Sequence, residues 1–170
     1  MVQLFSLLIL QVLLLSCNNN TDTPPGLNTG NATAVNPYKK IKAIPLPDGF
    51  ERIKDDSVSF TKFLRDINLK ENTTVYLFNG QPKSNQSAQY ALLDISTGNK
   101  DLQQCADAIM RLRAEYQFAK KQFDQIIFYD NEHTAYKFSA PFTRERFDNY
   151  LSRVFGMCGS ASLTKQLKPV

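Results

Sequence analysis

The chain has 170 residues, a length that fits one domain with appended segments. Lys and Arg number 20 against 16 Asp and Glu, a net charge of +4, and the basic residues are scattered along the chain. Nucleic-acid-binding proteins concentrate positive charge on one face or stripe, so this distribution argues against nucleic acid as a partner. The three cysteines and the single histidine lack metal-ligand spacing, and the sequence predicts neither a metal site nor a cofactor.

The first 16 residues, MVQLFSLLILQVLLLS, are almost wholly apolar and carry no charge. The run is shorter than the about 20 residues of a membrane-spanning helix, but it suits the core of a signal peptide. It ends in LLSC, residues 14–17, which resembles a bacterial lipobox, although no Lys or Arg precedes the apolar run. We predict a signal peptide over residues 1–16 and lipidation at Cys17, with a plain secretory signal and a chance cysteine as the alternative.

Lipidation of Cys17 would anchor the protein to a bacterial membrane, in the cell envelope, with the folded part facing the periplasm or the cell surface. Residues 18–40 are rich in Asn, Thr, Gly and Pro and have almost nothing to bury. Such a composition predicts a flexible tether. The predicted organisation is therefore a signal peptide, a lipidated cysteine with its linker over residues 17–40, and a single domain over residues 41–170.

The first half of the predicted domain alternates extended segments with turns. Residues 41–53 predict an extended entry segment and edge strand, with a turn at Asp48–Gly49. Apolar residues at helical spacing predict a short helix that starts near Ser57 or Ser59. TTVYLF, residues 73–78, predicts a strand that ends at the turn Asn79–Gly80, and AQYALLDIS, residues 88–96, predicts a second strand.

A helix is predicted from an N-cap at Asp101 to about Lys121, in the stretch DLQQCADAIMRLRAEY and the residues after it. Gln104 lies three residues after Asp101, as in a capping box. Apolar residues recur at steps of three and four and predict one buried face. That face consists of Leu102, Cys105, Ile109, Leu112 and Tyr116.

The remaining pattern predicts a hairpin followed by helices. QIIFYD and TAYKFS, residues 125–130 and 134–139, predict two strands joined by a turn at Asn131–Glu132. After Pro141 a helix is predicted through Phe147, Leu151, Val154 and Phe155, ended by Gly156 or Gly159, and residues 160–167 predict a last short helix. Short strands and hairpins packed with two main helices indicate an α+β fold.

Cys105 is the candidate catalytic residue, and two interpretations of it compete. On the apolar face it is a small buried residue, and its position favours this structural interpretation. Near a helix N-terminus it could instead be a nucleophile, since the helix dipole stabilises a thiolate. A nucleophile also needs a base, and the only histidine, His133, lies beside a predicted turn. A disulfide between Cys105 and Cys158 is a third option outside the cytoplasm.

Several segments carry a resemblance to a known family: PLPDGFERI, KSNQSAQYALLDI, DLQQCADAIMRLRAEY and YLSRVFGMCGSASLTKQLKPV. From about Ile44 to Val170 the chain resembles the uncharacterised family called domain of unknown function 4846. This family occurs mainly in lipoproteins and secreted proteins of the Bacteroidetes, in agreement with the lipobox. Its members continue past the equivalent of LKPV with a Gly-His strand, so the resemblance implies a chain truncated at its C-terminus.

A cysteine on a helix followed by a Gly-His strand is similar to the motif order of papain-like cell-wall hydrolases of the NlpC type. By this analogy the chain would be an incomplete papain-like domain, with Cys105 matching the nucleophile and its histidine beyond residue 170.

We therefore consider three functions. The leading one is a membrane-anchored envelope lipoprotein of unknown biochemical function that is non-catalytic in this form. The second is a papain-like cysteine amidase or peptidase that acts on cell-wall peptide and needs the missing histidine strand. The third is a binding module for a glycan or a protein, using aromatic residues such as Tyr38, Tyr90 and Tyr136.

Overall fold

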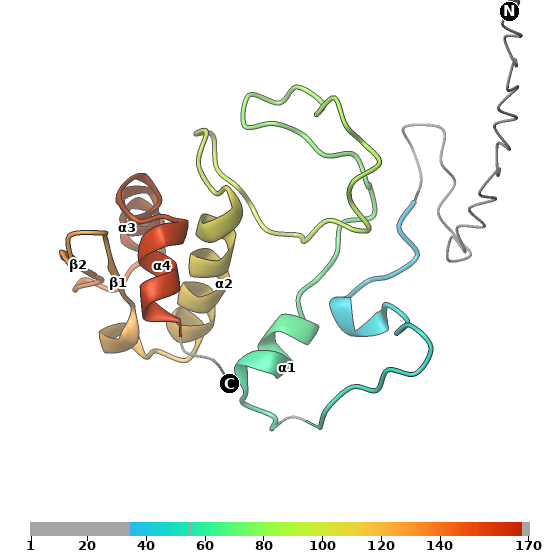
Figure 1. Cartoon of the computed structure of the whole chain (residues 1–170), viewed down its shortest axis with the longest axis horizontal. Helices are drawn as coiled ribbons and strands as arrows, with labels where there is room; N and C mark the ends of the chain where they lie inside the picture. The colour runs from blue at the N-terminus through green and yellow to red at the C-terminus, as the bar shows by residue number, and fades with distance from the viewer. Residues whose placement is uncertain (1–34, 55, 168–170) are drawn as a thin grey trace, which may run out of the picture.

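The structure, a computed structural model, describes residues 35–54 and 56–167. The predicted signal peptide, the predicted lipidation site Cys17 and the predicted linker up to residue 34 lie outside the described residues. The described part has an α+β fold, with the larger helices around a small antiparallel sheet at the C-terminal end (Figure 1). No helix within it is long and apolar enough to cross a membrane. In chain order the elements are η1 Ile41–Ala43, α1 Phe60–Arg65, α2 Cys105–Ala119, η2 Phe123–Gln125, β1 Ile127–Tyr129, β2 Ala135–Lys137, α3 Arg144–Met157 and α4 Ser160–Gln166.

The C-terminal half, residues 105–167, is organised around one apolar core. Helices α2, α3 and α4 pack with the β1–β2 hairpin, whose strands pair antiparallel with Phe128 opposite Tyr136. Ring contacts link the helices, as between Phe118 of α2 and Phe147 of α3, whose centroids are 4.5 Å apart. The fully buried large apolar side chains of this core are Met110, Ile126, Phe128, Phe147, Leu151 and Val154.

The predicted hairpin is confirmed, and a single carboxylate organises its turn. Asp130 accepts hydrogen bonds from the backbone N–H groups of Glu132 and Thr134, each at 2.9 Å. These bonds, together with that from the N–H of His133 to the carbonyl of Asp130, accommodate a left-handed backbone at His133, where φ is 62°. The hydrogen bonds to the carboxylate, chiefly that from the backbone of Thr134, hold the pKa of the Asp130 carboxyl below its usual range.

Both C-terminal helices lie where they were predicted. The hydroxyl of Thr143 accepts from the N–H of Arg146 at 3.3 Å and caps α3, as N-cap threonines do. All four residues of the predicted apolar face of α3 are buried. Of the two glycines predicted to end α3, Gly156 lies within the helix, whereas Gly159 directly follows the C-cap Cys158.

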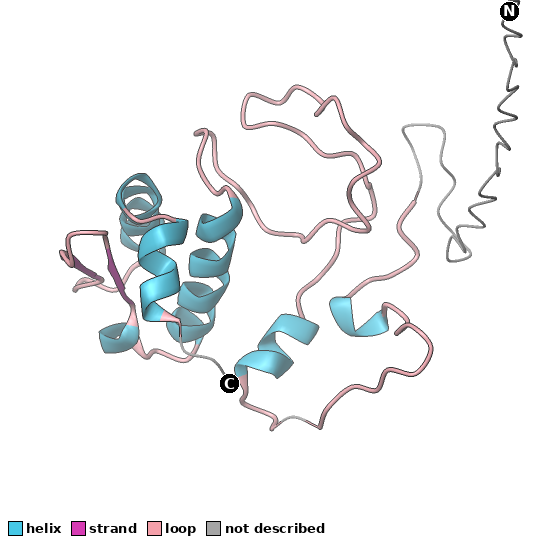
Figure 2. Ribbon diagram, in the orientation of Figure 1, coloured by secondary structure: helices cyan, strands magenta, loops and turns pink. Residues whose placement is uncertain are grey.

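The N-terminal half, residues 35–104, consists mostly of loops (Figure 2). The strands predicted at 73–78 and 88–96 are reduced to isolated bridges, Tyr76 with Pro82 and Leu69 with Leu93. Side chains occupy the backbone groups that a ladder would use: Gln86 accepts from the N–H of Val75 at 2.9 Å and donates to its carbonyl at 3.0 Å. Glutamine side chains therefore replace a neighbouring strand, which explains why the sheet is not continuous.

The start of the described chain is tied to the centre of this half. Asn36 is buried; its backbone N–H donates to Glu71 at 2.7 Å and its side-chain amide to Lys70 at 3.0 Å. Residues 36–40, placed in the linker by composition, are thus hydrogen-bonded to the domain. The strand predicted over residues 41–53 is wrong, since residues 41–43 form η1 and no strand follows in that range. The predicted turn at Asp48–Gly49 is present.

Helix α1 begins as predicted, with the hydroxyl of Ser59 accepting from the N–H of Lys62 at 3.1 Å. Helix α2 does not begin at Asp101. The backbone of Gln103 is left-handed, with φ of 67°, which interrupts any helix there, and α2 starts two residues later. Asp107 accepts from the N–H of Gln104 at 3.0 Å and closes this start, and burial raises the pKa of its carboxyl.

Candidate functional site

The predicted buried face of α2 has the right period but the wrong orientation. The core-facing side carries Ala106, Met110 and Ala114, all buried. On the predicted face, Cys105 is exposed and Ile109 is 51% exposed. The structural interpretation of Cys105 as a buried core residue is therefore wrong.

Two residues of the predicted face, Leu112 and Tyr116, are turned toward the N-terminal half, whereas Leu102 packs against the C-terminal core. The Tyr116 hydroxyl donates to the carbonyl of Val58 at 2.7 Å, and its ring contacts Phe60 and Phe63 of α1 at centroid distances of 5.3 and 5.6 Å. Leu112 lines a largely apolar cavity of about 300 Å³ shared with Val75, Leu92, Leu93 and Ile95. Helix α2 thus has one apolar side for each half of the molecule.

The two described cysteines differ in their surroundings. Both are free thiols, so the disulfide option is not realised. Cys105 is the exposed first residue of α2, whereas burial near Asp130 and Asp107 raises the pKa of the Cys158 thiol to about 11. His133 lies in the hairpin turn, and within the described chain no hydrogen bond or ion pair joins it to Cys105. The structure therefore does not assemble a cysteine–histidine pair from these two residues.

A polar cavity of about 420 Å³ lies between the loop of residues 96–100 and helices α2 and α3. The loop contributes Thr97 and Lys100, α2 contributes Arg111, and α3 contributes Asn149 and Ser152. Hydroxyl, amide and guanidinium groups on this wall can donate or accept hydrogen bonds. A volume of this order is typical of small-molecule sites, so the cavity is the candidate functional site.

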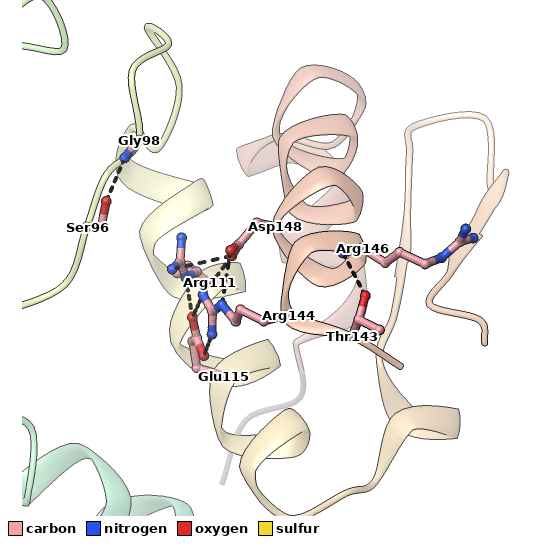
Figure 3. Close-up of polar contacts among 8 residues, drawn as sticks. All are labelled: Ser96, Gly98, Arg111, Glu115, Thr143, Arg144, Arg146 and Asp148. Atoms are coloured by element: carbon pink, nitrogen blue, oxygen red, sulfur yellow. Dashed lines mark hydrogen bonds and ion pairs between the residues drawn. The ribbon is translucent and has the colours of Figure 1, made fainter. Parts of the chain in front are cut away.

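Three charged side chains that line the polar cavity, Arg111, Arg144 and Asp148, are joined with Glu115 in one network (Figure 3). Arg144 of α3 donates to both oxygens of Glu115 on α2, each at 2.7 Å, and reaches Asp148 at 2.6 and 3.0 Å. Arg111 donates through Nε to Glu115 at 2.7 Å. The hydrogen bonds to Glu115, more than those to Asp148, raise the pKa of the Arg144 guanidinium further, so Arg144 is charged at any physiological pH.

Arg111 is the member of this network whose remaining hydrogen-bonding capacity is available to a ligand. Its side chain is only 10% exposed, and a guanidinium carries five N–H donors. Its Nε bonds Glu115 and one terminal nitrogen lies 4.0 Å from Asp148; no other hydrogen bond joins the group to the described residues. Arg111 lines this cavity and also the apolar cavity beside Leu112, so its partly desolvated side chain lies between the two spaces.

This network was not predicted from the sequence, although two of its ion pairs have a spacing that the sequence shows. Arg111 with Glu115 and Arg144 with Asp148 are opposite charges four residues apart, a spacing that pairs side chains on a helix. The bond between Arg144 and Glu115 crosses from one helix to another and has no local signal.

The three tyrosines considered for a binding surface do not form one exposed surface. Tyr136 is buried and donates its hydroxyl to Asp130 at 3.1 Å, so it offers no exposed ring. Tyr38 and Tyr90 stack with centroids 6.2 Å apart, and Tyr90 is 40% exposed. Over the described part of the chain, no group of three or more His, Cys, Asp or Glu side chains is arranged to hold a metal ion.

Comparison with known proteins gives one match. A family model described as "Domain of unknown function (4846)" matches residues 41–143, which include α1, α2 and the hairpin and end one residue before α3. No curated protein and no solved structure matches the chain. The match spans more than half of the 170 residues, and the chain belongs to the family of domain of unknown function 4846.

Proposed function

We propose that the protein is a membrane-anchored lipoprotein of the cell envelope whose domain binds a polar ligand in the cavity beside Arg111, without catalysing a reaction. The lipobox ending at Cys17 supports the anchoring. The observation that carries the binding role is the guanidinium of Arg111, which is 10% exposed, incompletely hydrogen-bonded and part of the cavity wall.

The chemistry of the cavity favours a peptide with a free carboxylate, the acidic group of a cell-wall peptide. The planar fork of an arginine matches a carboxylate with two parallel hydrogen bonds. The amide of Asn149 and the hydroxyl of Ser152 can pair with peptide N–H and C=O groups. The other network charges are already paired with one another, so Arg111 is the group left for the ligand.

Metabolic labelling with palmitate tests the anchoring. The wild-type protein incorporates label and fractionates with membranes, because acyl chains on Cys17 hold it there. Cys17→Ala incorporates none. Equal labelling of the variant would show that Cys17 is not the lipidated residue.

Calorimetric titration with a short peptide and with its C-terminal amide tests the binding. The acid binds and the amide, which cannot form the charged pair, binds at least about tenfold more weakly. Arg111→Gln loses this preference for the acid, whereas Arg113→Gln, an exposed position on the same helix, keeps it. Ser152→Ala, which leaves the charged network intact, weakens binding of both peptides. Equal binding of acid and amide by the wild type would overturn the proposed ligand.

A cysteine hydrolase acting on cell-wall peptide is the second candidate, and the exposure of Cys105 favours it. The first residue of α2 lies at the positive end of the helix dipole, where a thiolate is stabilised. In this candidate the base would come from the Gly-His strand of longer relatives. A thiol-specific probe should then label Cys105 faster in the folded protein than in a urea-denatured control, and Cys→Ala should abolish the activity of a longer relative. Slower labelling in the folded state would rule this candidate out.

A further inference from the structure

A third cavity, of about 350 Å³, lies between β2 and α3 and has a different electrostatic character from the polar cavity. We call it the basic groove. Its charged lining residues are Lys137, Arg146 and Arg153, and no carboxylate lines it. Ser139 and Asn149 add neutral hydrogen-bonding groups.

The cations of the basic groove have no ion-pair partners within the described part of the chain, unlike the arginines of the polar cavity. Arg144 pairs with Glu115 and Asp148, and Arg111 pairs with Glu115. None of Lys137, Arg146 and Arg153 lies in such a pair. Like charges that line one concave surface repel one another and raise the local potential, which an anion relieves.

Helix geometry brings these groups to one side of α3. Arg146, Asn149, Tyr150 and Arg153 are spaced at i, i+3, i+4 and i+7, which places them on one face of a helix. In Figure 3, Arg146 points away from the network of Arg144, Glu115 and Asp148. The charged groups of the basic groove and of the polar cavity therefore lie on different sides of α3, while Asn149 lines both cavities.

The walls of the basic groove are held together by specific contacts. The Tyr150 hydroxyl donates to the carbonyl of Tyr136 at 2.9 Å and so fixes β2 against α3. The guanidinium of Arg153 lies over the ring of Tyr136, 5.3 Å from its centroid, a cation–π contact. Lys137, the next residue of β2, also lines the groove.

We propose that the basic groove binds a phosphate group, as inorganic phosphate or as the terminal phosphate of a small ester. A phosphate dianion offers several acceptor oxygens to two guanidinium forks, an ammonium and the neutral donors, and its charge matches a site of three unpaired cations. The groove is compact and confined to one face of α3, whereas nucleic-acid binding requires an extended basic stripe. The proposal does not rest on the ligand proposed for the polar cavity, although Asn149 lines both cavities.

Calorimetric titration of the full chain with inorganic phosphate at low ionic strength tests this proposal. The triple variant Lys137→Gln, Arg146→Gln, Arg153→Gln binds phosphate at least about tenfold more weakly. A matched triple variant with the same change in net charge, Lys83→Gln, Arg113→Gln, Lys120→Gln, alters three exposed positions elsewhere and binds within about twofold of wild type. Arg146→Gln alone, at an exposed position, weakens binding about threefold or more and provides the readout if the triple variant does not fold.

Equal losses in both triple variants would overturn the proposal, because they would reflect general charge rather than the groove. The proposal would also be overturned if titration of the wild-type protein with inorganic phosphate gave no saturable heat of binding. Glucose 6-phosphate and vesicles of phosphatidylcholine with phosphatidic acid distinguish the source of the phosphate. Glucose 6-phosphate that competes with inorganic phosphate supports a small ester. If the protein binds the vesicles and inorganic phosphate does not displace it, that result would contradict phosphate binding in the basic groove.

Discussion

Residues 105–167 and residues 35–104 differ in what holds them together. The C-terminal half buries aromatic and aliphatic side chains in one cluster, whereas Leu69 is the sole buried apolar residue described in the N-terminal half. Large apolar side chains of that half face solvent, among them Phe50 at 70% and Ile53 at 72% exposure. Its chain is held by hydrogen bonds between side chains and backbone, such as those of Asn36 and Gln86, and by exposed ion pairs.

This difference indicates a gradient of stability along the molecule. Burial of apolar surface contributes far more free energy than exposed polar contacts, which exchange one set of hydrogen bonds for another. We expect the N-terminal half to open locally while the C-terminal half stays folded.

Phe147→Ala should cause the largest loss of stability, because Phe147 is fully buried against the rings of Phe118 and Phe138. Removing such a side chain costs about 3–5 kcal/mol. Urea unfolding followed by circular dichroism measures the loss. Phe50→Ala, at an exposed position of the other half, should change the free energy of unfolding by less than about 0.5 kcal/mol. Comparable losses in the two variants would contradict the proposed contrast.

Leu69→Ala should weaken the N-terminal half alone. A cost of about 2 kcal/mol, near the lower end for a buried leucine, corresponds to roughly thirtyfold faster opening of nearby hydrogen bonds. Amide hydrogen exchange should accelerate for Lys70 and Asp94, whose N–H groups bond Leu92 and Asn68. The amide of Phe138, bonded to Ile126 in the C-terminal half, should keep its rate. Acceleration at Phe138 as well would show that the two halves unfold together.

Glu115→Gln should cost about 1–3 kcal/mol, because the carboxylate accepts charge-assisted hydrogen bonds from both Arg111 and Arg144. Glu115 is 18% exposed, so solvent replaces these bonds only in part. Thermal unfolding at low and high salt measures the effect, which should shrink as salt screens the charges. Glu132→Gln, an exposed position in the hairpin turn, is the matched control and should be nearly neutral.

Acid should loosen the contact between η1 and α1. Hydrogen bonds from Lys62 and Lys42 hold the pKa of the Asp66 carboxyl well below its ordinary value of 3.8. A carboxyl whose pKa is lower in the folded than in the unfolded state contributes stability that is complete above the unfolded pKa. This stability is lost as the pH falls from the unfolded pKa to the folded pKa. Exchange of the Ile41 amide, which bonds Ile67, should therefore accelerate below about pH 4 after correction for intrinsic rates. Asp66→Asn should remove this acid dependence, and its persistence would assign the effect to another carboxyl.

The C-terminal half could be predicted from the sequence because its signals are local. The hairpin follows from alternating apolar strands around Asn131–Glu132, and α3 from a repeating apolar face that begins after Thr143. In the N-terminal half the same strand signals were misleading. There, Gln86 and Gln89 bond the backbone of residues 73–75, a competition that no strand periodicity reveals.

Helix α2 shows why the candidate site was harder to predict. Its apolar residues point in two directions: Leu112 and Tyr116 lie toward the N-terminal half, while Ala106, Met110 and Ala114 face the core. The spacing of the predicted face does not show which half of the molecule it packs against, and Cys105 was assigned to the core with it. The polar cavity depends on contacts between Arg144 and Glu115, 29 residues apart, which periodicity does not predict.

The position of α3 has a practical consequence for recombinant fragments of this family. The family match ends at Thr143, yet Phe147, Leu151 and Val154 of α3 cover the core side of α2 and the hairpin. A fragment cut at residue 143 would expose Met110, Phe128 and their neighbours to water, and such surfaces promote aggregation. Expression boundaries for this domain should therefore include α3 and α4 rather than stop where the family match ends.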